Sequence, residues 1–355
     1  MNINELVTPA NIVAYWDDVK ASQAAYMGDF LFPVKKIAGI ELNKISGRAG
    51  VPVELKASAF DTQAPYRDRL SVEVTKQKMA FFRERMKVDE ETRQQIMSIS
   101  NDSILKPYID RIFDDQNNLI KGGKVTREKM AMQLISTGKI AIDNNGVKLD
   151  YDYSLARKQK VKYSTAWSDT ENSTPIQDMI DWADDFHSNF YVTLKFAVMN
   201  TKTFNYIKKS KSIRAILYPN ATNTTAQLVT PAQVKDLIAT QVGITILIND
   251  GVYATEVGGS VKPFFPDDTV SFLPDGAING GIGNMIMGTT PEEIDLMANP
   301  KFSANTAIVD TAVAVYTRTI DHPVNVETIV SQIALPSFGT DVEGGAGSIL
   351  IATVA

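Results

Sequence analysis

Hydrophobic positions follow two different patterns along the 355-residue chain. In the first half, helix-spaced and alternating segments are separated by long polar stretches. From Thr174 onward, helical segments and apolar strands follow one another closely. A loop rich in Ser, Thr, Asp and Asn at residues 164–175 separates the two patterns. The pattern therefore predicts a mixed α+β chain with a domain boundary in this loop.

Three predicted helices begin with a Thr-Pro pair, in which the threonine caps the helix and the proline occupies its first position. The pairs start at Thr8, Thr174 and Thr230. They predict helices over residues 9–22, from residue 175 onward, and over residues 232–241. The second half also predicts a helix over residues 201–209 and strands over residues 190–199, 244–248 and 269–273.

Residues 38–82 form an unusual polar ribbon. Strand-like alternation at residues 51–56 and 70–75 flanks a turn-rich, polar connection at residues 58–69. Both strands carry alternating charges rather than one apolar face, so the ribbon would bury little on its own subunit. We expect it to pack on a neighbouring molecule, with an ordinary exposed hairpin as the alternative.

Residues 89–137 have helical spacing, but two features predict interruptions. Proline inside a helix removes a hydrogen bond, and glycine lowers helix stability. Pro107 and the Gly122-Gly123 pair are therefore expected to break the block. Its last piece is predicted to be a short helix over residues 127–137.

The strongest short hairpin signal in the chain is Asn145-Gly146, which lies between two alternating segments. A type I′ turn needs positive φ at both central residues, and Asn and Gly tolerate this conformation. The pair therefore predicts a tight hairpin.

Residues 279–289 contain four glycines, at positions 280, 281, 283 and 288. Glycine gives the backbone high conformational freedom, and this composition offers little to pack inside one subunit. The segment is therefore predicted to be a free loop.

Composition excludes several classes of protein. The chain is 44% hydrophobic and 22% charged, which is typical of a globular protein. Its net charge of -5 argues against a nucleic-acid groove spread over the whole surface. There is no cysteine, so thiolate chemistry and disulfides are absent. No signal peptide or membrane span is expected, because charged residues interrupt every apolar run.

Candidate catalytic residues are few. The two histidines, His187 and His322, have no partner at metal-ligand spacing. The glycines before Ile286 do not form a dinucleotide fingerprint, because isoleucine stands where the third Gly or Ala should be. We therefore expect no metal, no cofactor and no enzymatic activity.

Acidic doublets are the remaining candidates for acid–base chemistry. Asp267 and Asp268 precede a predicted strand, and adjacent strand residues point to opposite faces. They are therefore interpreted as a solvated turn. A hydrolase that uses this pair is the alternative from a different class.

Several segments together resemble the lambda-type phage major capsid (major head) proteins, the capsid protein E family. They are residues 139–151, 197–200, 249–254, 264–276 and 328–336, together with Phe204 and Ile207. The resemblance lies in the order of arm, ribbon, helix, hairpin and α/β region over most of the chain. The interruptions at Pro107 and Gly122-Gly123 depart from the continuous helix of that family.

This resemblance implies the Hong Kong 97-like phage capsid fold, an α+β fold. Its parts are an N-arm, an E-loop, a peripheral domain with a spine helix, and an axial α/β domain. On this sequence it implies an N-terminal helix and arm at residues 1–43 and an E-loop ribbon at 44–82. The peripheral domain would comprise 83–173 and 305–345, and the axial domain 174–304 and 346–355.

Two sets of contact residues follow from the resemblance. The E-loop tip, which would contact a neighbouring subunit, consists of Gln63, Tyr66, Arg67, Asp68 and Arg69. The axial-loop residues, which would meet at the ring centre, are Gly280, Gly281, Gly283, Asn284 and Met285.

The implied function is self-assembly into the icosahedral head shell of a tailed bacteriophage around packaged double-stranded DNA. The expected location is the virion, and the host cytoplasm during assembly. The implied partners are other copies in pentamers and hexamers, a portal protein, and DNA bound through its phosphates. A decoration protein is left open. A separate scaffolding protein is expected, because the first helix begins at Pro9 with no scaffold domain before it. A bacterial nanocompartment (encapsulin-like) shell is the alternative with the same fold.

Overall fold

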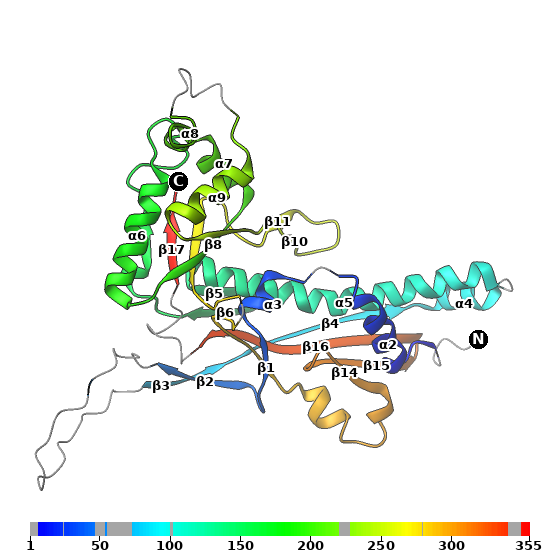
Figure 1. Ribbon diagram of the computed structural model, residues 1–355. Helices are drawn as coiled ribbons and strands as arrows, with labels where there is room; N and C mark the ends of the chain where they lie inside the picture. The colour runs from blue at the N-terminus through cyan, green and yellow to red at the C-terminus, as the bar shows by residue number, and fades with distance from the viewer. Residues whose placement is uncertain are drawn as a thin grey trace, which may run out of the picture.

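The computed structural model describes residues 6–23, 25–46, 54, 73–99, 102–219, 228–278, 280–339 and 349–355. These residues form two units, each with its own hydrophobic core. We call them the lower unit, a long helix on a six-stranded sheet, and the upper unit, helices around a five-stranded sheet (Figure 1). The description therefore confirms a mixed α+β architecture.

The lower unit is organised by its longest strand, β16 (Val324–Phe338), which is buried along nearly its whole length. The sheet order is β1-β13-β16-β15-β14, and β4 also pairs with β16. Its other strands are β1 (Val34–Lys36), β4 (Ala80–Val88), β13 (Gly283–Gly288), β14 (Thr306–Val309) and β15 (Val313–Asp321). Helices α2 (Pro9–Lys20), α3 (Met27–Leu31) and α4 (Glu90–Ser98) complete the unit. The short elements η3 (Glu292–Leu296) and η4 (Ser303–Asn305) lie beside β14 and β15.

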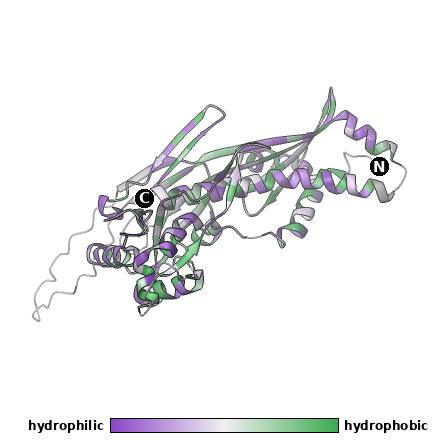
Figure 2. Ribbon diagram, turned by 90° about the horizontal axis from the view of Figure 1, so that it is seen from above, coloured by the Kyte–Doolittle hydropathy of each residue, from purple (hydrophilic) through white to green (hydrophobic). Residues whose placement is uncertain are grey.

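The long helix α5 (Asp102–Thr137) is continuous over 36 residues, so the breaks predicted at Pro107 and Gly122-Gly123 are wrong. Pro107 is the sixth residue of the helix, where it removes one backbone hydrogen bond of the helix and leaves the following turns intact. Gly123 lies against β16, where Gln332 Nε2 donates to its carbonyl oxygen over 3.0 Å. Hydropathy varies along the helix in Figure 2, as in a helix with one buried face. Packing on the sheet therefore outweighs weak local helix propensity.

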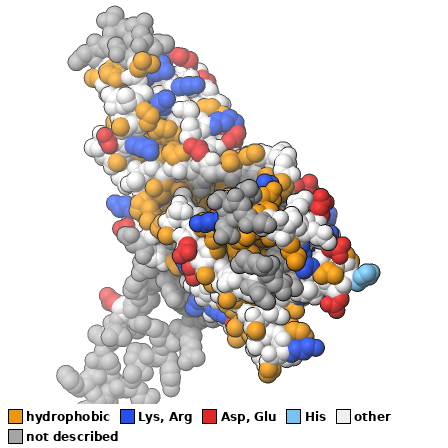
Figure 3. Space-filling view, turned by 90° about the vertical axis from the view of Figure 1, so that its right-hand side faces the viewer, with side chains coloured by type: hydrophobic (Ala, Val, Ile, Leu, Met, Phe, Trp, Pro, Cys, Tyr) orange, Lys and Arg blue, Asp and Glu red, His pale blue; other side chains and the backbone are white. Residues whose placement is uncertain are grey.

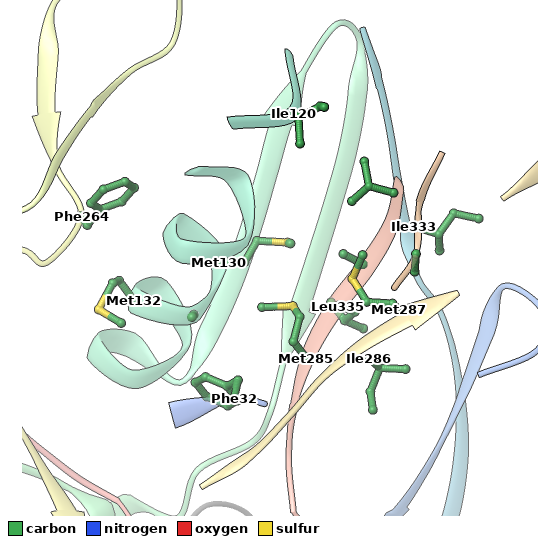
Figure 4. Close-up of a cluster of buried hydrophobic side chains, with 14 of the residues drawn as sticks. Phe32, Ile120, Met130, Met132, Phe264, Met285, Ile286, Met287, Ile333 and Leu335 are labelled. Carbon is green, nitrogen blue, oxygen red and sulfur yellow. The ribbon is translucent and has the colours of Figure 1, made fainter. Parts of the chain in front are cut away.

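Residues 283–288 are a second correction, because they form strand β13 and are not part of a free loop. The strand pairs antiparallel with β16 and parallel with β1. Met285 points toward Met130 of α5, and both side chains are buried (Figure 4). A side chain at Gly283 would overlap the Ser337 carbonyl oxygen of β16. This glycine therefore allows close approach of two strands rather than freedom of the backbone.

The upper unit has the sheet order β7-β17-β12-β8-β9. Its strands are β7 (Lys160–Lys162), β8 (Leu194–Met199), β9 (Thr245–Ile248), β12 (Thr269–Pro274) and β17 (Leu350–Thr353). Its helices are α6 (Pro175–Phe190), α7 (Thr201–Lys209), α8 (Lys211–Leu217) and α9 (Pro231–Gln241), and the short turn η1 (Arg157–Gln159) precedes β7. All three Thr-Pro helices begin at the proline, as predicted. Thr230 forms a capping box with Gln233, whereas the Thr174 side chain makes no capping hydrogen bond. The strand predicted from residue 190 begins four residues later, because α6 extends to Phe190.

Three antiparallel hairpins project from the two units. Strands β5 (Lys139–Asn144) and β6 (Val147–Asp152) confirm the predicted tight turn, with φ of 50° at Asn145 and 75° at Gly146. Strands β2 (Glu41–Ser46) and β3 (Glu73–Lys78) form the base of the predicted ribbon. Strands β10 (Val252–Ala254) and β11 (Val261–Pro263) form the third hairpin.

The two sheets do not follow the predicted domain division at residues 304 and 305. Strand β13 belongs to the six-stranded sheet, and Glu292 of η3 accepts a hydrogen bond from Ser331 of β16 over 2.7 Å. Residues 283–304 therefore lie with the lower unit, and the division into peripheral and axial domains stays a prediction. The C-terminal strand β17 returns to the upper sheet between β7 and β12.

Candidate functional site

The acidic doublet Asp267-Asp268 forms a fixed surface turn. Lys202 Nζ lies 2.8 Å from Asp267 Oδ2 and 3.7 Å from Asp268 Oδ1. Asp268 adopts a left-handed backbone, with φ of 59°. The hydrogen bond from Lys202 holds the pKa of Asp267 below its usual range. A carboxylate stabilised in this way is a poor proton donor, so the pair acts as a structural turn rather than as the acid–base pair of a hydrolase.

No described part of the chain brings together three or more metal-ligating side chains of His, Cys, Asp or Glu. Within the same residues, no helix combines the length and the apolar character that a membrane span requires.

The ribbon is the first candidate contact surface. Its base strands pair in register from Glu41 opposite Lys78 to Ser46 opposite Glu73. Glu41, Lys76 and Lys78 are exposed, so this part of the ribbon presents charged side chains to solvent. The predicted tip, Gln63, Tyr66, Arg67, Asp68 and Arg69, lies outside the described residues.

The predicted axial-loop residues lie at the end of the six-stranded sheet. Gly280 is exposed, Gly281 and Asn284 are partly buried, and Gly283 and Met285 are buried. Gly281 has a φ of 77° and packs against the arm, where a side chain would meet Pro33. The predicted axial-loop residues therefore pack inside one subunit, which contradicts the expectation of a loop with little to contact. Their role at a ring centre stays a prediction.

A buried carboxylate joins three segments at the junction of the two units. Glu128 of α5 is 3% exposed, and its Oε2 accepts a hydrogen bond from the backbone N–H of Gly28 over 2.7 Å. Its Oε1 lies 3.4 Å from Nδ2 of Asn249, which follows β9 of the upper unit. Burial raises the pKa of Glu128 to about 7. The arm, the long helix and the upper unit are thus linked at one titratable group.

A cavity of about 560 Å³ lies beside this junction. Its wall includes Tyr26, Met27 and Phe264, with Glu128 and Asn249 at its polar side. Tyr26 and Phe264 meet edge to face, with ring centroids 5.8 Å apart. The cavity therefore combines an aromatic wall with groups that can accept or donate hydrogen bonds. We call it the junction cavity.

The hairpin β10–β11 projects from the upper unit (Figure 1). Gly251 and Phe264, which flank this hairpin, line the junction cavity. Tyr253 on one of its faces stacks on Phe264, with ring centroids 5.1 Å apart. The opposite face is apolar and exposed: Val252 is 56% and Val261 65% exposed. Figure 3 views the side from which this hairpin projects and shows exposed hydrophobic side chains between charged ones. Such a face is typical of a surface that contacts another molecule.

Helix α6 lies on the other side of the upper unit (Figure 1). Asp181, Asp184 and Asp185 are exposed on it, and no described lysine or arginine forms an ion pair with any of them. The helix ends at Tyr191, which is 65% exposed and has a left-handed backbone with φ of 58°. Sequence reasoning missed Glu128 and Tyr191. The available signal for Tyr191 was a tyrosine directly after a predicted helix, where Gly or Asn is usual.

Comparison with protein families gives one match. Residues 9–314 match the model of the family described as phage major capsid protein E. No curated protein sequence matches the chain.

Two solved structures share the fold along nearly the whole chain. A candidate capsid protein of a prophage from Escherichia coli CFT073 superposes with a TM-score of 0.58 at 13% identity, over 100% of this chain and 99% of that one. A phage-related protein from Bordetella bronchiseptica RB50 gives a TM-score of 0.56 at 14% identity, over 98% and 97% of the two chains. At these identities the likeness establishes the fold.

Proposed function

The chain belongs to the phage major capsid protein E family, and we propose that its two units correspond to the domains of a Hong Kong 97-type shell subunit. As a member it is a structural component of the virion that forms the head shell, and it is not an enzyme. The family match covers residues 9–314, and it is the observation that carries this function. It favours a phage head over the nanocompartment shell, the alternative with the same fold.

The lower unit fits the peripheral domain, and the continuous 36-residue helix α5 fits its spine helix. The upper unit, with its separate core, fits the axial domain. The arm with α2 and α3 and the ribbon with β2 and β3 would be the N-arm and the E-loop. Of the predicted boundaries, the one at residue 304 moves to about residue 280, because β13 joins the lower sheet.

The partners are those of a shell subunit. Copies would associate head to tail into pentamers and hexamers, since such contacts close into rings. A separate scaffolding protein and a portal protein would assist assembly, and packaged DNA would be bound through its phosphates. The net charge of -5 supports contacts with DNA that are local and weak.

Purified chain is expected to form rings of five or six copies or larger particles, and light scattering with negative-stain imaging measures this directly. The physical reason is the exposed apolar and charged surface described above, which one subunit cannot bury. A chain that stays a 39.0 kDa monomer at every concentration, alone and with its scaffolding protein, would contradict the function.

Deletion of residues 60–68 is expected to leave a folded subunit that no longer assembles. The base of the ribbon exposes charged side chains and buries little on its own subunit, so its extension is proposed to pack on a neighbour. The measurement compares particle yield and the urea unfolding midpoint with the intact chain. A control replaces the same residues with a Gly-Ser linker of equal length. It distinguishes the effect of the lost side chains from the effect of a shorter ribbon. Normal particles from the deletion variant would show that the ribbon is not an assembly element.

A further inference from the structure

Tyr191 places a bulky side chain at a helix C-cap whose backbone conformation favours glycine. It caps α6 with a φ of 58°, a conformation that glycine adopts freely and that bulky residues avoid. Its side chain is 65% exposed. A bulky exposed aromatic at a position suited to glycine indicates that the side chain serves a contact outside the subunit.

The junction cavity offers a complementary site. It lies beside hairpin β10–β11, which projects from the side of the upper unit opposite α6 (Figure 1). Its wall of Tyr26 and Phe264 suits an aromatic ring. Glu128 and Asn249 line the same cavity and can hydrogen-bond a phenol hydroxyl. The exposed apolar face of hairpin β10–β11 lies beside it.

The charges without an ion-pair partner differ in sign on the two sides, although Asp250 also lines the cavity and Lys158 donates to Asn189 of α6. Lys121 lines the cavity, and Lys129 and Lys262 lie beside it, where burial and the charge of Lys262 lower the pKa of Lys129. None of these three lysines forms an ion pair with a described carboxylate. On the other side, α6 carries Asp184 and Asp185 within two turns of Tyr191, also without a described cation partner. Unpaired charges of opposite sign on two sides of one molecule favour head-to-tail association.

We propose that Tyr191 of one copy inserts into the junction cavity of the next copy around a ring, with the α6 aspartates facing the lysines beside that cavity. The occupant is a second copy of this chain, so the inference rests on the proposed function. The contact is heterologous: each copy presents one Tyr191 and one cavity, on different surfaces, and repetition of the contact closes a ring. Exposed tyrosines that enter pockets are frequent anchors of such interfaces.

The first test replaces Tyr191 with glycine, which relieves the left-handed strain while removing the ring. The urea unfolding midpoint of the dissociated subunit should stay the same or rise. The concentration needed for ring formation should rise about tenfold or more, since the anchor is lost. Tyr191→Phe is the matched control, and it should keep most of the association because it retains the ring.

The second test closes the cavity instead. Ala25 lines it and is exposed, so Ala25→Trp should fill its mouth without disturbing the core. Each variant alone should fail to form rings at concentrations where the intact chain does. An equal mixture of the two should form two-copy complexes, because it retains one intact Tyr191 and one open cavity. Mass photometry distinguishes these species.

The outcomes distinguish failure of the proposed contact from failure of the proposed shell function. Rings or shells at the intact chain's concentration from Tyr191→Gly or Ala25→Trp would overturn the contact and leave the shell function standing. Absence of two-copy complexes in the mixture would likewise overturn it. Failure of the intact chain to assemble would instead contradict the proposed function itself.

Discussion

Replacement of Gly283 with alanine is expected to destabilise the folded subunit by about 3 kcal/mol or more, at the upper end of the range for overpacking a core. The added methyl group would overlap the Ser337 carbonyl oxygen and lie 2.8 Å from Cα of Phe338. Both are backbone atoms of the last two residues of β16, which pair with the start of β13. They cannot move without separating the two strands. Urea unfolding and the yield of soluble protein measure the loss.

Gly280→Ala is the matched control from the same glycine-rich segment. A side chain there meets only the carbonyl oxygen of Gly276, at 3.6 Å, which is an ordinary contact. Its unfolding midpoint should remain close to that of the unmodified chain. Equal midpoints for the two variants would mean that Gly283 does not lie in a close strand pair.

Glu128→Gln is expected to stabilise the subunit by up to about 3 kcal/mol at pH 8 and to have little effect at pH 4. Glu128 is almost completely buried, and burial raises its pKa from 4.5 to about 7. Asp29 also raises this pKa, whereas hydrogen bonds from Gly28 and Asn249 oppose the shift. Glutamine keeps an acceptor for the Gly28 N–H and removes the buried charge.

The sign of this pH dependence follows from proton binding. Between about pH 4.5 and pH 7 the folded state holds the Glu128 proton more tightly than the unfolded state does, so stability falls as the pH rises. The destabilisation is complete above about pH 7 and absent well below pH 4.5. Unfolding free energies of the dissociated subunit at pH 4, 6 and 8 test this, with the exposed Glu256→Gln as the control. A constant difference between Glu128→Gln and the intact chain across this range would contradict the assignment.

The sequence alone determined the elements that depend on local chemistry. Thr8-Pro9 and Thr230-Pro231 begin helices because capping and a fixed proline φ act within one turn. Asn145-Gly146 forms a tight hairpin because few other residues adopt positive φ at both positions. The order of these elements was also sufficient to indicate the family.

Tertiary structure decided the features that depend on contacts between residues distant in the sequence. Pro107 and Gly122-Gly123 remain in one helix because α5 packs along β16, and this stabilisation has no local signal. The residues that flank Gly283 in the sequence are compatible both with a free loop and with a close strand pair. Only the position of Ser337, more than fifty residues away in sequence, distinguishes the two. Likewise, the pKa of Glu128 rises to about 7 because the fold buries its carboxylate, while the hydrogen bonds from Gly28 and Asn249 only partly oppose this rise. Burial by residues distant in the sequence leaves no pattern in the sequence around Glu128.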